Sequence, residues 1–266
     1  MFKHINSFPK ISTKNPRVSI LYITYNRIYY TKNTLPALLN SSSYPFDVYI
    51  VDNGSTDGTI EYLQEITHPK INQIIFNKKN EGLVNPTKKF WKTTDSELIG
   101  KIDNDILVPT NWVENLVEAH TKIPNLGAIG YSHFRVEDYD NTTVKNKVNL
   151  INGIHIRQQP WIGGNYIMKR TTTINYKGYK QSRKFLKKRI LYGFNAYQEL
   201  LSKNGFIHGY LCNKEKELLT WDHLDDPRHE MFYKDDNYYK IRNMTEKEII
   251  KWFKKDAKNL LEGGAK

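Results

Sequence analysis

The chain is poor in several features, and each scarcity excludes a class of protein. Cys212 is the only cysteine among 266 residues, so the chain can form neither an internal disulfide nor a thiolate metal site. The first residues, MFKHIN, lack the apolar core of a signal peptide, and no apolar run is long enough to span a bilayer. We therefore expect a cytoplasmic protein in a reducing compartment, in which the glycosylation sequons at Asn141 and Asn243 are not used.

Acidic residues are also outnumbered. The chain has 28 Asp and Glu against 40 Lys and Arg, which gives a net charge of +12. A basic surface suits nucleic acid, anionic lipid or a phosphorylated substrate, but a lysine-rich composition spread over a solvated surface gives the same sum. The net charge therefore identifies no partner. The length, with 39% hydrophobic and 13% aromatic residues, fits one large globular domain or a domain with an appendage.

The first half of the chain alternates β-rich apolar runs with amphipathic segments. Strands are expected at 17–24, 46–52, 72–76, 97–103 and 126–131, and helices at 31–40, 59–66, 82–94 and 111–121. Strands and helices that alternate at this spacing predict βαβ units and a mainly parallel sheet.

The second half is less regular. We expect a mobile polar loop at 137–147, strands at 148–157, 164–169 and 205–211, and a helix at 196–202. Thr245 and Glu248 predict a capping box for a helix over 245–261, whose apolar stripe would comprise Ile249, Trp252, Phe253, Ala257 and Leu260. Without internal repeats or linkers, the sequence predicts one α/β domain at 1–226 and a C-terminal helical extension at 227–266.

Two aspartates stand in the apolar run at 99–109. Asp103 and Asp105 are separated by one residue, so in an extended chain their side chains point to the same side. Open α/β sheets bind ligands at the carboxyl edge, and hard cations such as Mn²⁺ or Mg²⁺ link carboxylates to phosphates. The pair therefore predicts a metal-assisted phosphate site, although solvated loop aspartates give the same pattern.

Four segments in strand-end order support this interpretation: 18–27, 48–59, 80–91 and 99–107. Together they resemble the nucleotide-sugar half of family 2 glycosyltransferases with the GT-A fold, and the resemblance extends over about 17–225. It implies a Rossmann-like, mostly parallel sheet flanked by helices, with a smaller acceptor-side sheet. It also implies a donor half at about 17–108, an acceptor half at about 109–226, a UDP-hexose or other nucleotide-diphosphate sugar, and Mn²⁺ or Mg²⁺.

The resemblance implies donor-binding roles at the strand ends. The loop Thr24, Tyr25, Asn26 and Arg27 would line the base and ribose. Asp52 would accept a hydrogen bond from the imide nitrogen of uracil, and Asn80 and Gly82 would lie under the nucleoside, where glycine allows a close backbone approach. The structural alternatives are that Asp52 is a turn residue and that Asn80 is a helix cap.

The resemblance also implies the metal ligands. Asp103 would contact ribose or metal, and Asp105 would ligate the cation that bridges the two phosphates. His223 would complete the metal shell as a neutral imidazole, with His208 and His229 as less favoured alternatives. The interpretation fails if the two carboxylates turn apart, or are buried with basic partners that leave no room for a diphosphate.

The expected catalytic base is missing from its usual place. Inverting members of the family carry an acid at the start of a helix, about ten residues before a glycine, and the matching positions here are Phe194 and Asn195, before Gly205. A general base must deprotonate the acceptor hydroxyl, and Glu199 and Asp222 are the remaining carboxylate candidates. A relocated base, a retaining mechanism and an inactive homologue all stay open.

Two segments of the second half bear on the acceptor. Trp161, Gly163 and Gly164 match the acceptor-side glycine segment of the family, in which an aromatic face can stack on a sugar. A core tryptophan in a tight turn is the alternative. The basic stretch at 177–189, and Lys180–Arg189 in particular, favours a polyanionic acceptor such as a glycan, a lipid-linked glycan or nucleic acid. The lysines of the last helix allow peripheral membrane contact, although packing on the domain is the favoured role of that helix.

Three functions compete at this point. The leading one is inverting, metal-dependent hexose transfer to a hydroxyl of a glycan, a lipid-linked glycan or a modified DNA base. The second is a non-catalytic polyanion or nucleic-acid binder on a degenerate GT-A scaffold, which the missing base and the net charge motivate. A nucleotidyltransferase also uses paired carboxylates and two metals. It would be expected to carry a phosphate loop rich in glycine and lysine after the first strand, where this chain has Tyr25-Asn26-Arg27.

Overall fold

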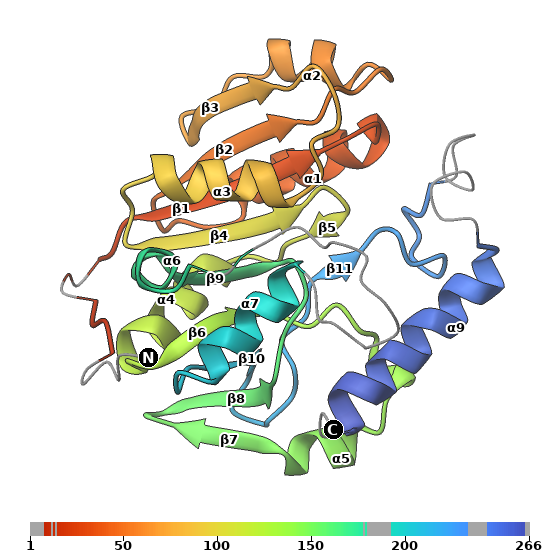
Figure 1. Ribbon diagram of the computed structural model, residues 1–266. Helices are drawn as coiled ribbons and strands as arrows, with labels where there is room; N and C mark the ends of the chain where they lie inside the picture. The colour runs from red at the N-terminus through yellow and green to blue at the C-terminus, as the bar shows by residue number, and fades with distance from the viewer. Residues whose placement is uncertain are drawn as a thin grey trace, which may run out of the picture.

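The computed structural model describes residues 8–11, 13, 15–177, 179, 193–233 and 244–263. Within them, nine strands form one sheet in the order β3-β2-β1-β4-β9-β6-β10-β8-β7, with helices on both faces (Figure 1). The strands are β1 (Val18–Thr24), β2 (Phe46–Asp52), β3 (Ile71–Phe76), β4 (Leu98–Asp103), β6 (Leu126–Gly130), β7 (Val148–Ile151), β8 (Ile154–Gln159), β9 (Tyr166–Lys169) and β10 (Ile207–Cys212).

The first four strands of this order are parallel, as the alternation of strands and helices predicts. All seven residues of β1 are buried, which explains its unbroken apolar sequence, because a central parallel strand is covered on both faces. The strand β9 runs antiparallel to both β4 and β6. It therefore joins the four parallel strands of the first half to the second half of the chain in one mixed sheet.

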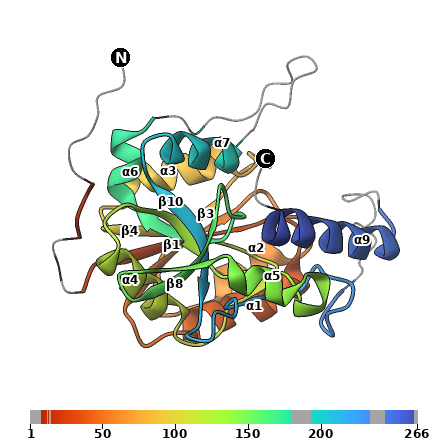
Figure 2. The same ribbon diagram turned by 90° about the horizontal axis from the view of Figure 1, so that it is seen from below.

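Helices cover the two faces of the sheet in separate layers (Figure 2). The helices α3 (Val84–Thr93), α6 (Arg170–Asn175) and α7 (Gly193–Ser202) lie on one face, and α1 (Ile28–Asn40) and α4 (Trp112–Lys122) lie on the other. The short helix α2 (Thr59–Glu65) follows β2 and buries Leu63 in the same core cluster as α1 and α4.

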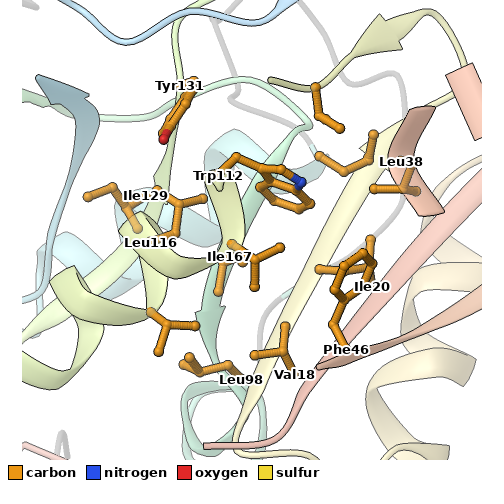
Figure 3. Close-up of a cluster of buried hydrophobic side chains, with 14 of the residues drawn as sticks. Val18, Ile20, Leu38, Phe46, Leu98, Trp112, Leu116, Ile129, Tyr131 and Ile167 are labelled. Carbon is orange, nitrogen blue, oxygen red and sulfur yellow. The ribbon is translucent and has the colours of Figure 1, made fainter. Parts of the chain in front are cut away.

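The core under α1 and α4 centres on Trp112 (Figure 3). Its fully buried indole lies edge-on to Phe46 and Trp221, with ring centroids 6.4 and 6.2 Å apart. Such edge-to-face pairs add to the free energy gained by burying the rings. Since Phe46 belongs to the first half and Trp221 to the second, this cluster joins the two halves of the chain.

Two segments differ from the sequence predictions. The expected mobile loop at 137–147 instead holds a 3₁₀ turn at Val136–Asp138 and the helix α5 (Asn141–Asn146), which Asp140 caps by accepting hydrogen bonds from the backbone N–H groups of Thr142 and Thr143. The expected strand at 148–157 is the hairpin β7–β8. Its turn places Asn152 and Gly153 at φ 48° and 81°, the conformation that an Asn-Gly pair favours in a hairpin.

The C-terminal helix α9 (Glu246–Ala257) begins with the predicted capping box between Thr245 and Glu248. Its last turn, Lys258–Glu262, is π-helical. The wider turn changes the side-chain register, so that Leu261 is the fully buried residue there and Leu260 is only partly buried. Trp252, expected in the apolar stripe, is 43% exposed.

Within the described part of the chain, no helix is both long and apolar enough to cross a membrane. The predicted cellular location rests on the sequence alone and stays a prediction.

His208, a less favoured candidate for a metal ligand, is instead a buried residue that links β6 to α7. Its Nδ1 accepts a hydrogen bond from the Ala128 backbone N–H at 2.8 Å, and its Nε2 donates to the Gln198 carbonyl at 3.1 Å. Both ring nitrogens are therefore used by the neutral form. Burial, the main cause, lowers the pKa of His208 to about 4.

This burial predicts a loss of stability in mild acid. Between about pH 6.5, where histidine titrates in an unfolded chain, and pH 4, the unfolded state binds a proton that His208 does not bind in the fold. The free energy of unfolding should fall by about 2 kcal/mol from pH 7 to pH 5 on account of His208. Urea unfolding at both pH values measures this fall, which should be smaller in His208→Gln and unchanged in the control His155→Gln. A ring that titrates near pH 6.5 in a proton NMR series would contradict the prediction.

Candidate functional site

The candidate site lies at the carboxyl edge of β1, β2 and β4. The strand register pairs Thr24 with Asp52, and Ile23 with Asp103. The residues that follow these strands therefore reach one edge of the sheet, where open α/β folds bind their ligands. The two-stranded sheet of β5 (Ile106–Leu107) and β11 (Asp222–His223) adjoins this edge.

Three loops at this edge are tied together by asparagines. Asn26, at φ 48°, donates its backbone N–H to Ser55 Oγ at 2.9 Å and accepts a bond from the Thr56 N–H at 2.7 Å. Asn53 donates its amide to the Gly82 carbonyl at 3.1 Å. The loops after β1, β2 and β3 therefore hold one another in place. Asn80 accepts a hydrogen bond from the Gly82 N–H at 2.8 Å and stays exposed.

Two of the predicted donor-binding residues are buried. Thr24 shares a hydrogen bond of 2.9 Å with Thr31 Oγ1. The Asp52 carboxylate is wholly buried and accepts hydrogen bonds from the N–H groups of Gly54 and Ser55, both at 2.9 Å, and from the Ser55 hydroxyl. For Asp52 to accept a hydrogen bond from a base N–H, this turn would have to release the carboxylate. Tyr25, by contrast, is 37% exposed.

The second aspartate of the pair is held by an arginine. The Arg27 guanidinium bonds to Asp105 at 2.7 Å and to Asp225 at 3.1 Å, and the three side chains are 17, 13 and 0% exposed. Burial alone would lower the pKa of Arg27, but attraction to the two carboxylates outweighs it and raises the pKa. Sequence reasoning missed Asp225 because it lies 198 positions from Arg27 and follows no motif.

The first aspartate is held by a lysine. Asp103 forms an ion pair with Lys101, whose side chain is 5% exposed. The Asp103 backbone N–H donates to Asn165 Oδ1 at 2.6 Å. A Cβ atom on Gly164 would lie 3.0 Å from Asp103 Oδ2 and 3.2 Å from Lys101 Nζ, so a glycine lets this segment approach the pair closely. The glycine segment at 163–164 and the first aspartate thus come together.

The predicted metal shell of Asp103, Asp105 and His223 is not assembled. The backbone of His223 lies beside the acidic pair, since β11 pairs with β5 and the Leu224 N–H donates to the Asp105 carbonyl at 2.8 Å. The imidazole, however, lies 5.4 Å from the His133 ring and 5.2 Å from the Phe253 ring. In the described ranges no three His, Cys, Asp or Glu side chains converge as a metal site. The Arg27 guanidinium is the cation that Asp105 and Asp225 share.

His229 does not join this group either. Its Nδ1 accepts a hydrogen bond from the Met231 N–H at 3.0 Å within its own turn.

The two carboxylates predicted as a general base, Glu199 and Asp222, lie in different surroundings. Glu199 is 43% exposed and forms an ion pair at 3.0 Å with Lys203, one helical turn away on α7. It therefore faces solvent on α7, and its role as a base stays a prediction. Phe194 stacks on Tyr166 with ring centroids 4.0 Å apart. Asn195 lies in the first turn of α7. Asp222 is exposed and lines a cavity of about 650 Å³ with His133 and His223.

A residue that the sequence did not suggest holds the segment predicted to face the acceptor. Gln198 accepts a hydrogen bond from the Ile162 N–H and donates one to the Ile162 carbonyl, both at 2.9 Å. This paired contact fixes the backbone between Trp161 and Gly163. Trp161 itself is only partly buried, which leaves part of its ring open to a ligand.

A mostly parallel sheet with an acidic pair at its carboxyl edge, closed by a second half of the chain, is the GT-A architecture. The chain belongs to glycosyl transferase family 2, whose model matches residues 19–198. An uncharacterized glycosyltransferase of Haemophilus influenzae is 27% identical over 116 residues, which are 43% of this chain and 36% of that protein. The chondroitin synthase of Escherichia coli is 29% identical over 136 residues, which are 50% of this chain and 19% of the synthase. The chain therefore spans well under half the length of these relatives.

Solved structures share the fold. A mannosyltransferase of Pyrobaculum calidifontis, in complex with GDP-Man and Mn²⁺, aligns with a TM-score of 0.52 at 22% identity, over 66% of this chain and 50% of that one. S. aureus TarS 1–349, in complex with UDP-GlcNAc, aligns with a TM-score of 0.50 at 13% identity, over 91% of this chain and 73% of that one.

The buried ion triad predicts an unequal response to two arginine substitutions. Arg27→Ala removes the cation that the buried carboxylates of Asp105 and Asp225 share, which should lower the free energy of unfolding by about 3 kcal/mol. Arg17→Ala removes an arginine that is 61% exposed and paired with Asp95, and should change it little. Urea unfolding of both variants measures the difference. Equal, small effects would contradict the triad.

Proposed function

We propose that the chain transfers a hexose from a nucleotide-diphosphate sugar, and specifically a UDP-hexose, to a hydroxyl acceptor. The observation that carries the proposal is the contact between the two halves of the site, in which Gly164 of the acceptor segment lies against Asp103. A transferase must bring donor and acceptor to one point, since proximity supplies much of the rate acceleration. Family membership supports the same reaction class.

The charges at the sheet edge support a diphosphate donor. Arg27 and Lys101 place two cations beside the strand ends, and guanidinium and ammonium groups bind phosphate oxygens well. The two structural relatives described above carry GDP-Man and UDP-GlcNAc, both of which are nucleotide-diphosphate sugars. Tyr25 and Asn80, which are exposed at the same edge, offer a stacking face and an amide to the nucleoside.

We also propose a divalent cation, Mn²⁺ or Mg²⁺, at Asp105 and Asp225. These carboxylates already share one cation, the guanidinium of Arg27, and carboxylate oxygens are the ligands that such ions prefer. When bound, the ion would neutralise charge on the diphosphate leaving group. Arg27 would then turn to the phosphates. His223 stays a proposed third ligand because its backbone lies next to Asp105.

Asp222 is the proposed general base of an inverting reaction. It is the remaining carboxylate of the two that the sequence nominated, and it opens into the cavity beside His223. In this reaction the acceptor oxygen attacks the anomeric carbon as the bond from that carbon to the phosphate oxygen breaks. The leaving nucleotide takes the bonding electron pair, and the Asp222 carboxylate takes the hydroxyl proton.

The acceptor is proposed to be a glycan, a lipid-linked glycan or another polyanion. The basic stretch Lys180–Arg189 that motivates a polyanion or nucleic acid lies outside the described residues.

A second candidate function is a non-catalytic polyanion binder. The ion pairs of Asp103 with Lys101 and of Asp105 with Arg27 favour it, because a metal ion and a diphosphate must displace these cations. The absence of an acid at Phe194 and Asn195 favours it as well. The two functions differ in whether the chain binds a nucleotide sugar.

Donor binding distinguishes the two functions. A UDP-sugar with Mn²⁺ should stabilise the chain by about 2.7 kcal/mol when the ligand is at ~100 times its dissociation constant. The stabilisation should vanish in Asp105→Asn and persist in Asp47→Asn, which alters an exposed residue of β2. Thermal unfolding with UDP-glucose, UDP-GlcNAc and GDP-mannose, with and without Mn²⁺, measures it. A chain that responds to none of these but binds heparin would instead be the non-catalytic protein.

Kinetics test the base. Asp222→Asn should lower kcat by about 100-fold or more, the contribution expected of a general base, with the donor KM unchanged. Glu199→Gln should keep full activity. Steady-state transfer assays with both variants measure this, and the anomeric configuration of the product by NMR establishes inversion. An active Asp222→Asn enzyme that retains configuration would rule out this role.

A further inference from the structure

The exposed side of α9 is a one-sided basic surface. It carries five exposed lysines, which are Lys247, Lys251, Lys254, Lys255 and Lys258. At 3.6 residues per turn these positions fall within an arc of about 100° around the helix axis. In the described part of the chain none of the five lies within ion-pair distance of a carboxylate, although the charge of Lys251 contributes to lowering the pKa of Glu248, which is mainly held by the capping box with Thr245. The lysine charge is therefore presented outward as a continuous stripe, which we call the α9 basic face.

The other side of α9 fixes the direction of this stripe. Ile249, Phe253, Ala257 and Leu261 are at most 1% exposed. Since the apolar side is used in packing on the domain, the helix cannot roll to bury its lysines. The α9 basic face must therefore meet solvent or a partner.

Trp252 stands at the border between the two sides. It is 43% exposed and its ring lies 5.0 Å from that of Phe253. A large ring at such a border costs free energy in water. A tryptophan ring is more stable at a membrane interface, where its apolar part meets the lipid and its indole N–H stays hydrated. Trp252 beside a lysine stripe is therefore typical of a surface that meets lipid headgroups.

The position of α9 places this surface next to the candidate site. Phe253 lies 5.2 Å from the ring of His223, whose strand pairs with β5 directly after Asp105. Figure 1 shows α9 at the periphery of the molecule, beyond β11. The buried side of α9 thus faces the segment of His223, and the α9 basic face points away from it, toward the outside of the molecule.

We propose that the α9 basic face docks on an anionic lipid surface, with the lysines against the headgroups and Trp252 in the interface. Charge complementarity identifies this occupant, because anionic leaflets attract clustered lysines, and the exposed indole adds an apolar contact that a soluble polymer does not need. The contact is reversible and weakens with salt, since the buried side of α9 stays with the domain and screening reduces surface attraction. This proposal does not depend on sugar transfer.

Vesicle binding by the full chain tests the proposal. The chain should sediment with vesicles of phosphatidylcholine and phosphatidylglycerol, and should stay in solution with phosphatidylcholine alone. Each lysine near the surface contributes a factor of about five to partitioning. The triple variant Lys251→Gln, Lys255→Gln and Lys258→Gln should therefore bind about 100-fold more weakly, and Trp252→Ala should weaken binding further.

A matched control removes the same charge elsewhere. Lys78→Gln, Lys89→Gln and Lys92→Gln neutralise three exposed lysines on α3 and the loop before it, and should leave vesicle binding within about twofold because charge acts only near the surface. Equal losses in both triple variants would show that net charge, and not α9, drives binding. Failure of the wild-type chain to bind the anionic vesicles, or binding of dextran sulfate through the α9 lysines without vesicle binding, would also overturn the proposal.

Discussion

The Arg27 guanidinium lies between the carboxylates of Asp105 and Asp225, and this ion triad ties three distant parts of the chain together. It joins the end of β1, the residues after β4 and the segment after β11. Charges this far from water are stable only when they are paired, since removing one partner leaves a costly buried charge. Tyr30 reinforces the same closure, because its hydroxyl lies 3.2 Å from the carbonyl oxygens of Leu224 and Tyr233. The geometry of the candidate site therefore follows from where Arg27 is held.

The triad gives the site its particular electrostatics. Lys101 and Arg27 together pair with three carboxylates, those of Asp103, Asp105 and Asp225, so most of the acidic charge at this edge is offset. An incoming diphosphate would bring negative charge to two cations that are already in position, and preorganised charges lose little free energy in reorienting. If Arg27 turned to the phosphates, Asp105 and Asp225 would be free to hold the proposed divalent cation. The same contacts explain why the chain can fold stably around an acidic pair.

The sequence was sufficient for the parallel half of the fold because its central strands β1 and β4 are buried on both faces and therefore read as apolar runs, and because its helices are amphipathic. It predicted β2 to the residue and placed Asp103 and Asp105 at a strand end. It could not predict Asp225, Lys101 and Gln198 as partners, because each acts through a contact between segments that are distant in sequence or through the direction of one side chain. The choice between Glu199 and Asp222 is different: Lys203 stands four residues after Glu199, a local spacing that suggests an ion pair on a helix, and the structure shows this pair. The hairpin turn at Asn152-Gly153 was also missed, although an Asn-Gly pair is a local sequence signal for such a turn.

A crystal structure with a UDP-sugar and Mn²⁺, analysed by its anomalous signal at the manganese absorption edge, tests whether Asp105 and Asp225 bind the cation and Arg27 binds the diphosphate of the donor. The result expected is a manganese peak between Asp105 and Asp225, with the Arg27 guanidinium moved onto the diphosphate. Crystals in which Arg27 still bridges the two carboxylates, while manganese and nucleotide bind elsewhere or not at all, would contradict the account.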